Sequence, residues 1–300
     1  MNELARIQDF TSVIDSLVTS INVPNTRRAY QRHITDFIDW YVAKGHPRLN
    51  KLVVSQYVTY LTARTLSAAS INQALAAIRW LARELEDSGK LDSVLASGIQ
   101  RAKGVRSEGK RTGNWLSKKD AQKVLRAPDT SLLLGLRDRA LLSIFIGSGL
   151  RRSEAAALTF DHIQQRNSRW VLVDITGKRN KLRTVPIASW VHQSIVEYAD
   201  KAGISSGYVF RPILKGGYKL NGDSMTPQAV RDAVMKYLPD GITPHDLRRT
   251  FAKLARSGSA ELTQIQLSLG HSSVKTTQDY VGEDLDLTSA PSDMLGLKLL

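Results

Sequence analysis

The chain has 300 residues, a formal net charge of +14 and no cysteine. The lack of cysteine excludes disulfides, thiolate metal sites and a cysteine nucleophile, and it fits a reducing cytoplasm. So large an excess of positive charge favours a polyanionic partner, either nucleic acid or an anionic membrane surface. No apolar run approaches the ~18 residues of a membrane span, and residues 1–10 lack a signal-peptide pattern. We therefore expect nucleic acid rather than a membrane as the partner, and a cytoplasmic, nucleoid-associated location.

Residues 1–100 are expected to form a small bundle of four or five helices. Apolar residues recur at helical spacing over 30–41, after a cap at Asn25 or Thr26, and over 71–85, after a cap at Ser67 or Ser70. Several arginines fall outside this apolar pattern, where each is either a phosphate contact or an ordinary solvated side chain. These candidate DNA contacts are Arg27, Arg28, Arg32, Arg79 and Arg83.

Residues 101–114 differ in composition from the bundle before them. They contain three glycines, five lysines or arginines and one acid, and almost no apolar side chain. This composition predicts a linker, either an ordinary flexible tether or one that lies along a phosphate backbone. Its candidate DNA contacts are Lys103, Arg106, Lys110 and Arg111.

Residues 115–300 are expected to form a second domain, mostly helical with a small β-hairpin or sheet. The fold class is therefore mainly α, with a helical bundle followed by a mixed α/β domain. An apolar tail over 282–300 is expected to pack on something, such as a neighbouring copy. The clearest elements are a capped helix start at 116–120, helices near 136–146, 189–201 and 226–238, and strands over 170–175 and 182–187 around a basic turn.

The candidate chemistry lies in five side chains of this second domain. Arg151 stands in a turn just after Gly149, where its guanidinium is free to bind a phosphate. His245 and Arg248 lie on one face at the start of a helix that Thr243 caps, a favourable place for an anion. His271 follows a helix end at Gly270, and Tyr280 lies about two turns along the next helix. Taken singly, each of these residues is better explained as an ordinary surface, cap or core residue than as a catalytic one.

The combination points to attack on a phosphodiester. A tyrosine hydroxyl with a pKa near 10 is a poor nucleophile unless its developing charge is stabilised. Two arginines can bind the non-bridging oxygens, and histidines can bind the same oxygens or accept the tyrosine proton. The leaving sugar oxygen needs a proton, which a lysine on the hairpin turn can supply. Lys178 is the candidate, and Lys181 is its close competitor.

Four linked motifs between residues 147 and 281 resemble the tyrosine recombinase (phage integrase) family, and most closely its compact Xer-like members. They read GSGLRRSEAAALTFDHI, TGKRNKLRTVPI, TPHDLRRTFA and LGHSSVKTTQDYV. The helical N-terminal region is similar to the core-binding domain of the family, although this likeness is weaker. By position, the catalytic set of the family corresponds to Arg151, Lys178, His245, Arg248, His271 and the nucleophile Tyr280.

The resemblance implies a complete reaction. Tyr280 attacks a DNA phosphate, forms a 3′-phosphotyrosyl link and releases a 5′-hydroxyl, which needs neither ATP nor a metal or other cofactor. A homotetramer, with or without a paralogue, exchanges strands through a Holliday junction. The two domains clamp a double-stranded recombination site, the linker 101–114 crosses it, and the tail 282–300 docks into the next protomer.

Other functions compete with this interpretation. A type IB topoisomerase would use nearly the same residues, and a non-enzymatic DNA-binding protein would explain the charge alone. A metal-dependent nuclease or DDE-type transposase would need clustered carboxylates, whereas the acids here are scattered. Because the helical bundle begins almost at Met1, we expect no additional arm-binding domain. This favours dimer resolution or integration and excision of a mobile element.

Overall fold

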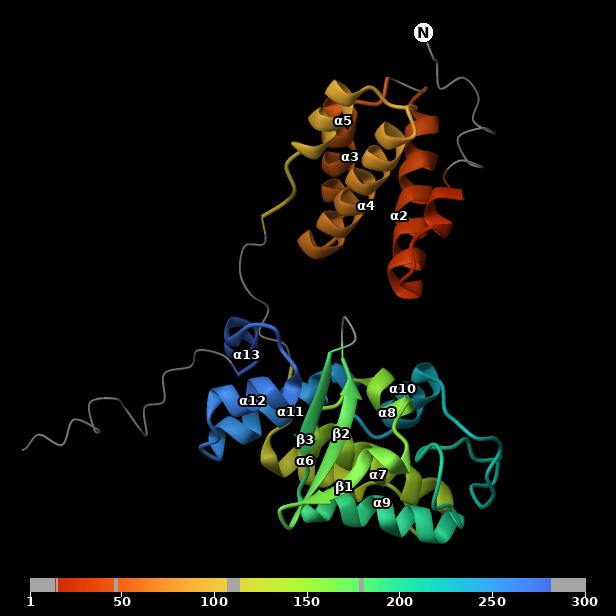
Figure 1. The fold of residues 1–300 in the computed structure, drawn as a ribbon, viewed down its shortest axis with the longest axis vertical. Coiled ribbons are helices and arrows are strands. Elements are labelled where there is room, and N and C mark those ends of the chain that lie inside the picture. The colour runs from red at the N-terminus through yellow and green to blue at the C-terminus, as the bar shows by residue number, and fades with distance from the viewer. Residues whose placement is uncertain (1–13, 15, 46–47, 107–113, 178–180, 282–300) are drawn as a thin grey trace, which may run out of the picture. The chain divides into compact units, whose positions relative to one another are not determined.

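The computed structural model describes residues 14, 16–45, 48–106, 114–177 and 181–281. The chain divides into two compact units, Met1–Lys110 and Arg111–Leu300, each of which is drawn in Figure 1. The described part is mainly helical with one small antiparallel sheet, which confirms the expected fold class. Among the described residues, no helix has the length and apolar character that crossing a bilayer requires.

The first unit is a helical bundle around one apolar core. Apolar side chains on the facing sides of the helices, such as Phe37, Tyr57 and Leu81, are almost completely buried there. Ser67 caps the fourth helix by accepting the N–H of Ser70, as the sequence predicted. Its helices are α2 (Pro24–Ala43), α3 (Lys51–Ala63), α4 (Ala68–Asp87) and α5 (Ser93–Gln100).

The start of α2 differs from the prediction. The helix begins at Pro24 after Val23, so Asn25 and Thr26 lie inside its first turn and do not cap it. Proline is well suited to the first helical position, because its fixed φ matches the helix and its missing N–H has no partner to lose there. The proline therefore sets the boundary two or three residues earlier than the polar residues suggested.

The segment that leaves α5 is attached to α4. The side-chain amide of Asn72 donates to the Val105 carbonyl (2.9 Å) and accepts the Val105 N–H (3.0 Å). Arg79 donates to the Ala102 carbonyl, and Gln100 donates to the Arg79 carbonyl (2.8 Å). The first part of the predicted linker is thus fixed to the bundle, whereas residues 107–113 lie outside the described residues.

The second unit surrounds α7, a helix buried on nearly every side. Its apolar residues, such as Leu141 and Phe145, are inaccessible to solvent, and α6, α9 and α11 pack around it. The helices are α6 (Lys118–Arg126), α7 (Leu133–Ser148), α8 (Arg152–Ala156), α9 (Ser189–Ala202), α10 (Pro227–Met235), α11 (Pro244–Ser257), α12 (Leu262–Leu269) and α13 (Val274–Val281).

The sheet contains the predicted hairpin and one additional strand. β2 (Arg169–Thr176) and β3 (Leu182–Pro186) pair antiparallel, and Gly177 N–H donates to the Lys181 carbonyl (2.8 Å) beside the turn. β1 (Ile163–Arg166) pairs with β2 on its other side. The sequence of β1, IQQR, is short and has only one apolar residue, so it lacks the alternating pattern by which strands are recognised.

Gly149 and Gly270 end the two helices that meet at the candidate site. Gly149 follows α7 with φ +63°, and Gly270 follows α12 with φ +63°. Glycine adopts this left-handed conformation without the steric cost that a Cβ brings. A Cβ on Gly149 would also lie 2.8 Å from side-chain carbons of Leu269 and Phe251. The close approach of α7, α11 and α12 therefore needs glycine at this position.

We expect Gly149→Ala to destabilise the second unit more than Gly203→Ala does. Both glycines have positive φ, but a Cβ on Gly203 would meet nothing within 4 Å. Gly203→Ala should cost about 1–2 kcal/mol of unfolding free energy from backbone strain alone. Gly149→Ala should lose a further ~1–3 kcal/mol from overpacking. Thermal unfolding of the two variants measures the difference, and equal losses would contradict the packing argument.

Candidate active site

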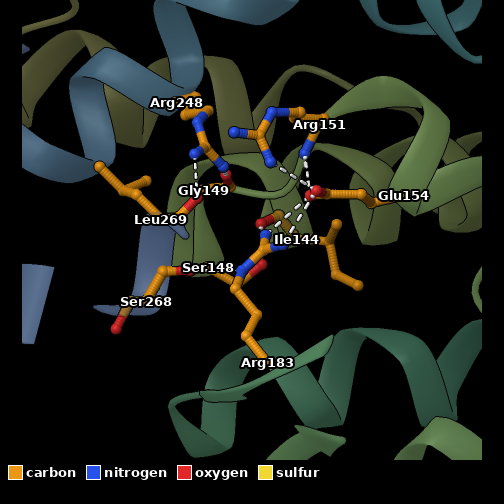
Figure 2. Close-up of polar contacts among 9 residues, drawn as sticks. All are labelled: Ile144, Ser148, Gly149, Arg151, Glu154, Arg183, Arg248, Ser268 and Leu269. Atoms are coloured by element: carbon orange, nitrogen blue, oxygen red, sulfur yellow. Dashed lines mark hydrogen bonds and ion pairs between the residues drawn. The ribbon is translucent and has the colours of Figure 1, made fainter. Parts of the chain in front are cut away.

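Arg248 lies at the centre of the candidate site. It is the fifth residue of α11 and is only 1% exposed. One Nη donates to the Gly149 carbonyl (2.5 Å) and the other to the Leu269 carbonyl, at the ends of α7 and α12 (Figure 2). Carbonyls at helix C-termini have no partner within the helix and carry partial negative charge. They stabilise the buried guanidinium without neutralising it as a carboxylate would.

The electrostatics of Arg248 reflect this arrangement. Burial, followed by the positive charge of Arg151, lowers the pKa of its guanidinium to about 10. Its Nε has no hydrogen-bond partner among the described residues. A cation that is buried, repelled by a second cation and incompletely hydrogen-bonded is stabilised by an anion.

Arg151 is held beside it by Glu154. Arg151 precedes α8, and both its backbone N–H (2.7 Å to Oε2) and its Nη1 (2.7 Å to Oε1) donate to the Glu154 carboxylate. Burial disfavours the charged carboxylate, but hydrogen bonds from Arg183 and Arg151 outweigh this and lower the pKa of Glu154 to about 2. The carboxylate therefore stays ionised and fixes the direction of the Arg151 fork.

His245 and Tyr280 contact each other directly. The hydroxyl oxygen of Tyr280, from α13, lies 2.5 Å from Nε2 of His245, the second residue of α11. Desolvation, followed by the charges of Arg248 and Arg249, lowers the pKa of His245 below its usual value. A neutral imidazole at this distance can accept the proton of the hydroxyl. The sequence predicted both residues, and the structure brings them together.

His271 lies on the other side of Tyr280. Their ring centroids are 4.7 Å apart, and Nδ1 of His271 lies 2.9 Å from the buried Thr277 hydroxyl. Desolvation, followed by the charges of Arg248 and Arg151, lowers the pKa of His271 to about 4. The ring is therefore neutral at pH 7. If Nδ1 accepts the threonine proton, Nε2–H remains available as a donor.

A cavity of about 400 Å³ opens beside these residues. Arg151, Arg248 and His245 line it, together with Arg152 and Arg231. Among the described residues that line it, every ionised side chain is positive and none is acidic. It is therefore suited to an anion. A cavity of about 630 Å³ between α6, α7 and α9 is lined by none of the candidate residues that the structure describes.

Of the remaining predicted residues, some lie outside the described residues, some are bonded within the first unit and some are exposed. Lys178 lies outside the described residues, as do Lys110 and Arg111, whereas the competing Lys181 is exposed at the hairpin. Arg79 and Arg27 donate to backbone carbonyls within the first unit, so part of their hydrogen-bonding capacity is already used. The exposed candidates are Arg28, Arg32, Arg83, Lys103 and Arg106.

Three residues near the site were not singled out from the sequence. Thr277 contacts His271, and the guanidinium carbon of Arg249 lies 5.0 Å from the centroid of the Tyr280 ring. Arg183, on β3, donates to Glu154. The spacing along β3 could have identified Arg183, because it lies two residues before the apolar Val185 and side chains two apart in a strand share a face. In the structure Val185 is completely buried, so this face points to the interior.

Comparison with known proteins identifies the family. Residues 114–285 match the phage integrase family, and residues 11–89 match the N-terminal SAM-like domain of phage integrases. Tyrosine recombinase XerC of Brucella suis biovar 1 (strain 1330) is 30% identical over 278 residues, which cover 87% of this chain and 84% of the relative. Tyrosine recombinase XerC of Xylella fastidiosa (strain M23) is 30% identical over 277 residues, which are 90% of each chain.

A solved structure shows the same fold. The post-cleavage complex of the XerH site-specific recombinase bound to palindromic difH substrate aligns with a TM-score of 0.68 at 19% identity, covering 85% of this chain and 75% of that chain. The family match and the XerC relatives show that this chain belongs to the phage integrase family. It is a tyrosine recombinase of the Xer-like type, an enzyme of site-specific DNA recombination. The topoisomerase and the non-enzymatic alternatives are not favoured.

We expect the pKa of His271 to respond to an anion in the cavity. An NMR titration of the free protein should show His271 protonating near pH 4. Because histidine in the unfolded chain protonates near 6.5, stability should fall as the pH falls from about 6.5 towards 4. Inorganic sulfate should raise the pKa of His271 by shielding it from the arginines.

His192 is the matched control for this titration. Burial alone lowers its pKa, and it stacks on Trp170 at a centroid distance of 3.5 Å. Its pKa should not move with sulfate. A pKa of His271 near 6.5, or a pKa that sulfate does not change, would contradict the proposed electrostatics of the site.

Proposed function

We propose that this recombinase cleaves and rejoins DNA through a covalent bond to Tyr280. The observation that carries the proposal is the 2.5 Å contact between the Tyr280 hydroxyl and Nε2 of His245, a residue that also lines the cationic cavity. The nucleophile, a neutral base and an anion pocket are thus contiguous. These are the three parts that attack of a tyrosine on a phosphodiester requires.

In the proposed cleavage step, Arg151 and Arg248 bind the non-bridging oxygens of the scissile phosphate. His245 accepts the proton of Tyr280 as its oxygen forms a bond to phosphorus, and the bond from phosphorus to the 5′-oxygen breaks. Nε2–H of His271 donates to a non-bridging oxygen. The electron pair leaves on the 5′-oxygen, which takes a proton from Lys178. A 3′-phosphotyrosyl link and a 5′-hydroxyl result, and attack by another 5′-hydroxyl reverses the step.

We assign the DNA-binding roles by the same proposal. Residues 1–100 form a core-binding domain, 101–114 a basic linker and 115–300 the catalytic domain, which together clamp a duplex recombination site. The net charge of +14 and the exposed basic side chains of the first unit support binding to phosphates. A protein of the same fold, the XerH site-specific recombinase, has been solved bound to palindromic difH substrate, which supports this assignment.

Strand exchange is proposed to proceed in a homotetramer through a Holliday junction, with the tail 282–300 docked into the next protomer. The proposed role at the nucleoid is resolution of dimers or integration and excision of a mobile element. Sequencing the DNA that becomes covalently attached to the protein in cells identifies the site and distinguishes these roles. Attachment at scattered sequences would contradict site-specific recombination.

Tyr280→Phe should abolish the covalent adduct and leave DNA binding nearly intact. The substitution removes the nucleophilic oxygen and at most one hydrogen bond, so affinity should change by less than about tenfold. Denaturing electrophoresis detects the adduct, and a binding titration measures affinity. Tyr218→Phe is the control, because Tyr218 is 72% exposed in a loop and should form the adduct normally. A stable adduct with Tyr280→Phe would reject the assigned nucleophile.

Lys178→Ala should cleave an ordinary phosphodiester about 10²- to 10⁴-fold more slowly, as expected for loss of a general acid. A substrate with sulfur in place of the bridging 5′-oxygen has a leaving group that needs no proton, so cleavage of it should be nearly normal. Lys181→Ala is the control. Rescue of Lys181→Ala and not of Lys178→Ala would exchange the two assignments.

A further inference from the structure

Arg183 is a partly buried arginine that joins three segments around the candidate site. Its side chain is 9% exposed and comes from β3. Nη1 and Nη2 donate side by side to Oε1 (2.9 Å) and Oε2 (2.8 Å) of Glu154. Nε donates to the carbonyl of Ser268 (2.9 Å), near the end of α12. Figure 2 shows Arg183 approaching the Glu154 carboxylate opposite Arg151.

The shared carboxylate fixes the Arg151 side chain. Each oxygen of Glu154 accepts one hydrogen bond from Arg151 and one from Arg183. Parallel hydrogen bonds between a guanidinium and a carboxylate define the orientation of both groups, which a single contact does not. The carboxylate therefore cannot turn without breaking the paired contact to Arg183, and its Oε1 stays in place to accept the hydrogen bond from Nη1 of Arg151.

Arg183 also determines the local charge. Arg151 and Glu154 alone would form a neutral pair, which attracts a phosphate weakly. With Arg183 the cluster contains two guanidinium groups and one carboxylate, so its net charge is +1. Glu154 can then orient Arg151 without cancelling its charge. The remaining positive charge acts in a site with restricted solvent, where Coulomb interactions are stronger than in water.

The contact to Ser268 connects this cluster to the turn that presents His271. A Cβ on Gly270 would lie 2.9 Å from Cδ of Arg183, so the turn packs closely on the arginine side chain. The same turn also provides the Leu269 carbonyl that binds Arg248. A shift of Arg183 would therefore displace the positions of Arg151, Arg248 and His271 together.

We propose that Arg183 is a positioning residue for phosphate binding and cleavage: it holds Arg151 through Glu154, keeps the cluster positive, and fixes the turn before His271. The inference rests on the proposed function, which it deepens. A buried ion pair alone is weak evidence of a gain in stability. The test must therefore measure anion affinity and cleavage separately from folding.

The first experiment measures the affinity of the full chain for inorganic sulfate. The NMR signals of the His271 ring report the binding. Arg183→Met should bind sulfate about tenfold more weakly, since the charge of the cluster falls from +1 to 0. Arg211→Met is the control for loss of one arginine. Arg211 holds a loop through the Tyr208 and Ser206 carbonyls and does not line the cavity. Equal sulfate affinity in Arg183→Met and Arg211→Met would overturn the proposal.

The second experiment measures single-turnover cleavage of the duplex recovered by covalent trapping. Arg183→Met should cleave on the order of 10²-fold more slowly, because a small displacement of binding groups has a large effect on rate. The defect should shrink on a methylphosphonate substrate, whose scissile linkage is neutral and relies less on the arginines. Arg183→Met should slow cleavage less in an Arg151→Ala background than in the wild-type protein, since part of its effect passes through Arg151. Full additivity would overturn the proposal.

Arg183→Lys tests the same positioning role if Arg183→Met does not fold. Lysine retains the charge but cannot form the parallel pair with Glu154. Sulfate affinity should then be largely retained while cleavage slows, and cleavage at the wild-type rate would overturn the positioning role. Failure of the proposed function gives a different pattern, in which the wild-type protein forms no adduct although sulfate binding still depends on Arg183.

Discussion

The candidate site depends on the way in which one positive charge is buried. Arg248 is almost inaccessible, yet its hydrogen bonds go to the carbonyls of Gly149 and Leu269 and not to an acid. The ends of α7 and α12 can provide those carbonyls because each terminates in a left-handed glycine. The site thus keeps positive charge in a partly desolvated position. Desolvation, together with this positive charge, lowers the pKa of both His245 and His271.

A second constraint orients the other arginine of the site, Arg151. Glu154 is the acid that holds Arg151, and Arg183 compensates its negative charge. Arg151 is therefore oriented by a carboxylate without being neutralised by it. Groups that are held in place before a substrate arrives need little reorganisation as charge develops on it, which is the main source of electrostatic catalysis. The network of β3, α8 and α12 is in this sense part of the site, although Arg183 does not line the cavity.

Much of this arrangement was predictable from the sequence because it depends on local chemistry. Hydrophobic periodicity predicted the helices, and polar or glycine residues such as Ser117, Thr243 and Gly149 marked their ends. Motif order predicted which side chains carry chemistry, and the structure brings His245, His271 and Tyr280 into contact. Tertiary contacts were not predictable. The carbonyls that bind Arg248 and the Ser268 contact of Arg183 join segments distant in sequence, and β1 has no pattern of its own.

The contact between His245 and Tyr280 has a consequence for assemblies that contain more than one chain. Both residues, and the cavity arginines Arg151 and Arg248, belong to the same polypeptide. On the proposed chemistry each subunit cuts the strand that its own pocket holds. Two differently damaged subunits, one lacking the tyrosine and the other an arginine, would then fail to complement each other. In a mixed population, the extent of strand cutting would follow the fraction of intact subunits in direct proportion.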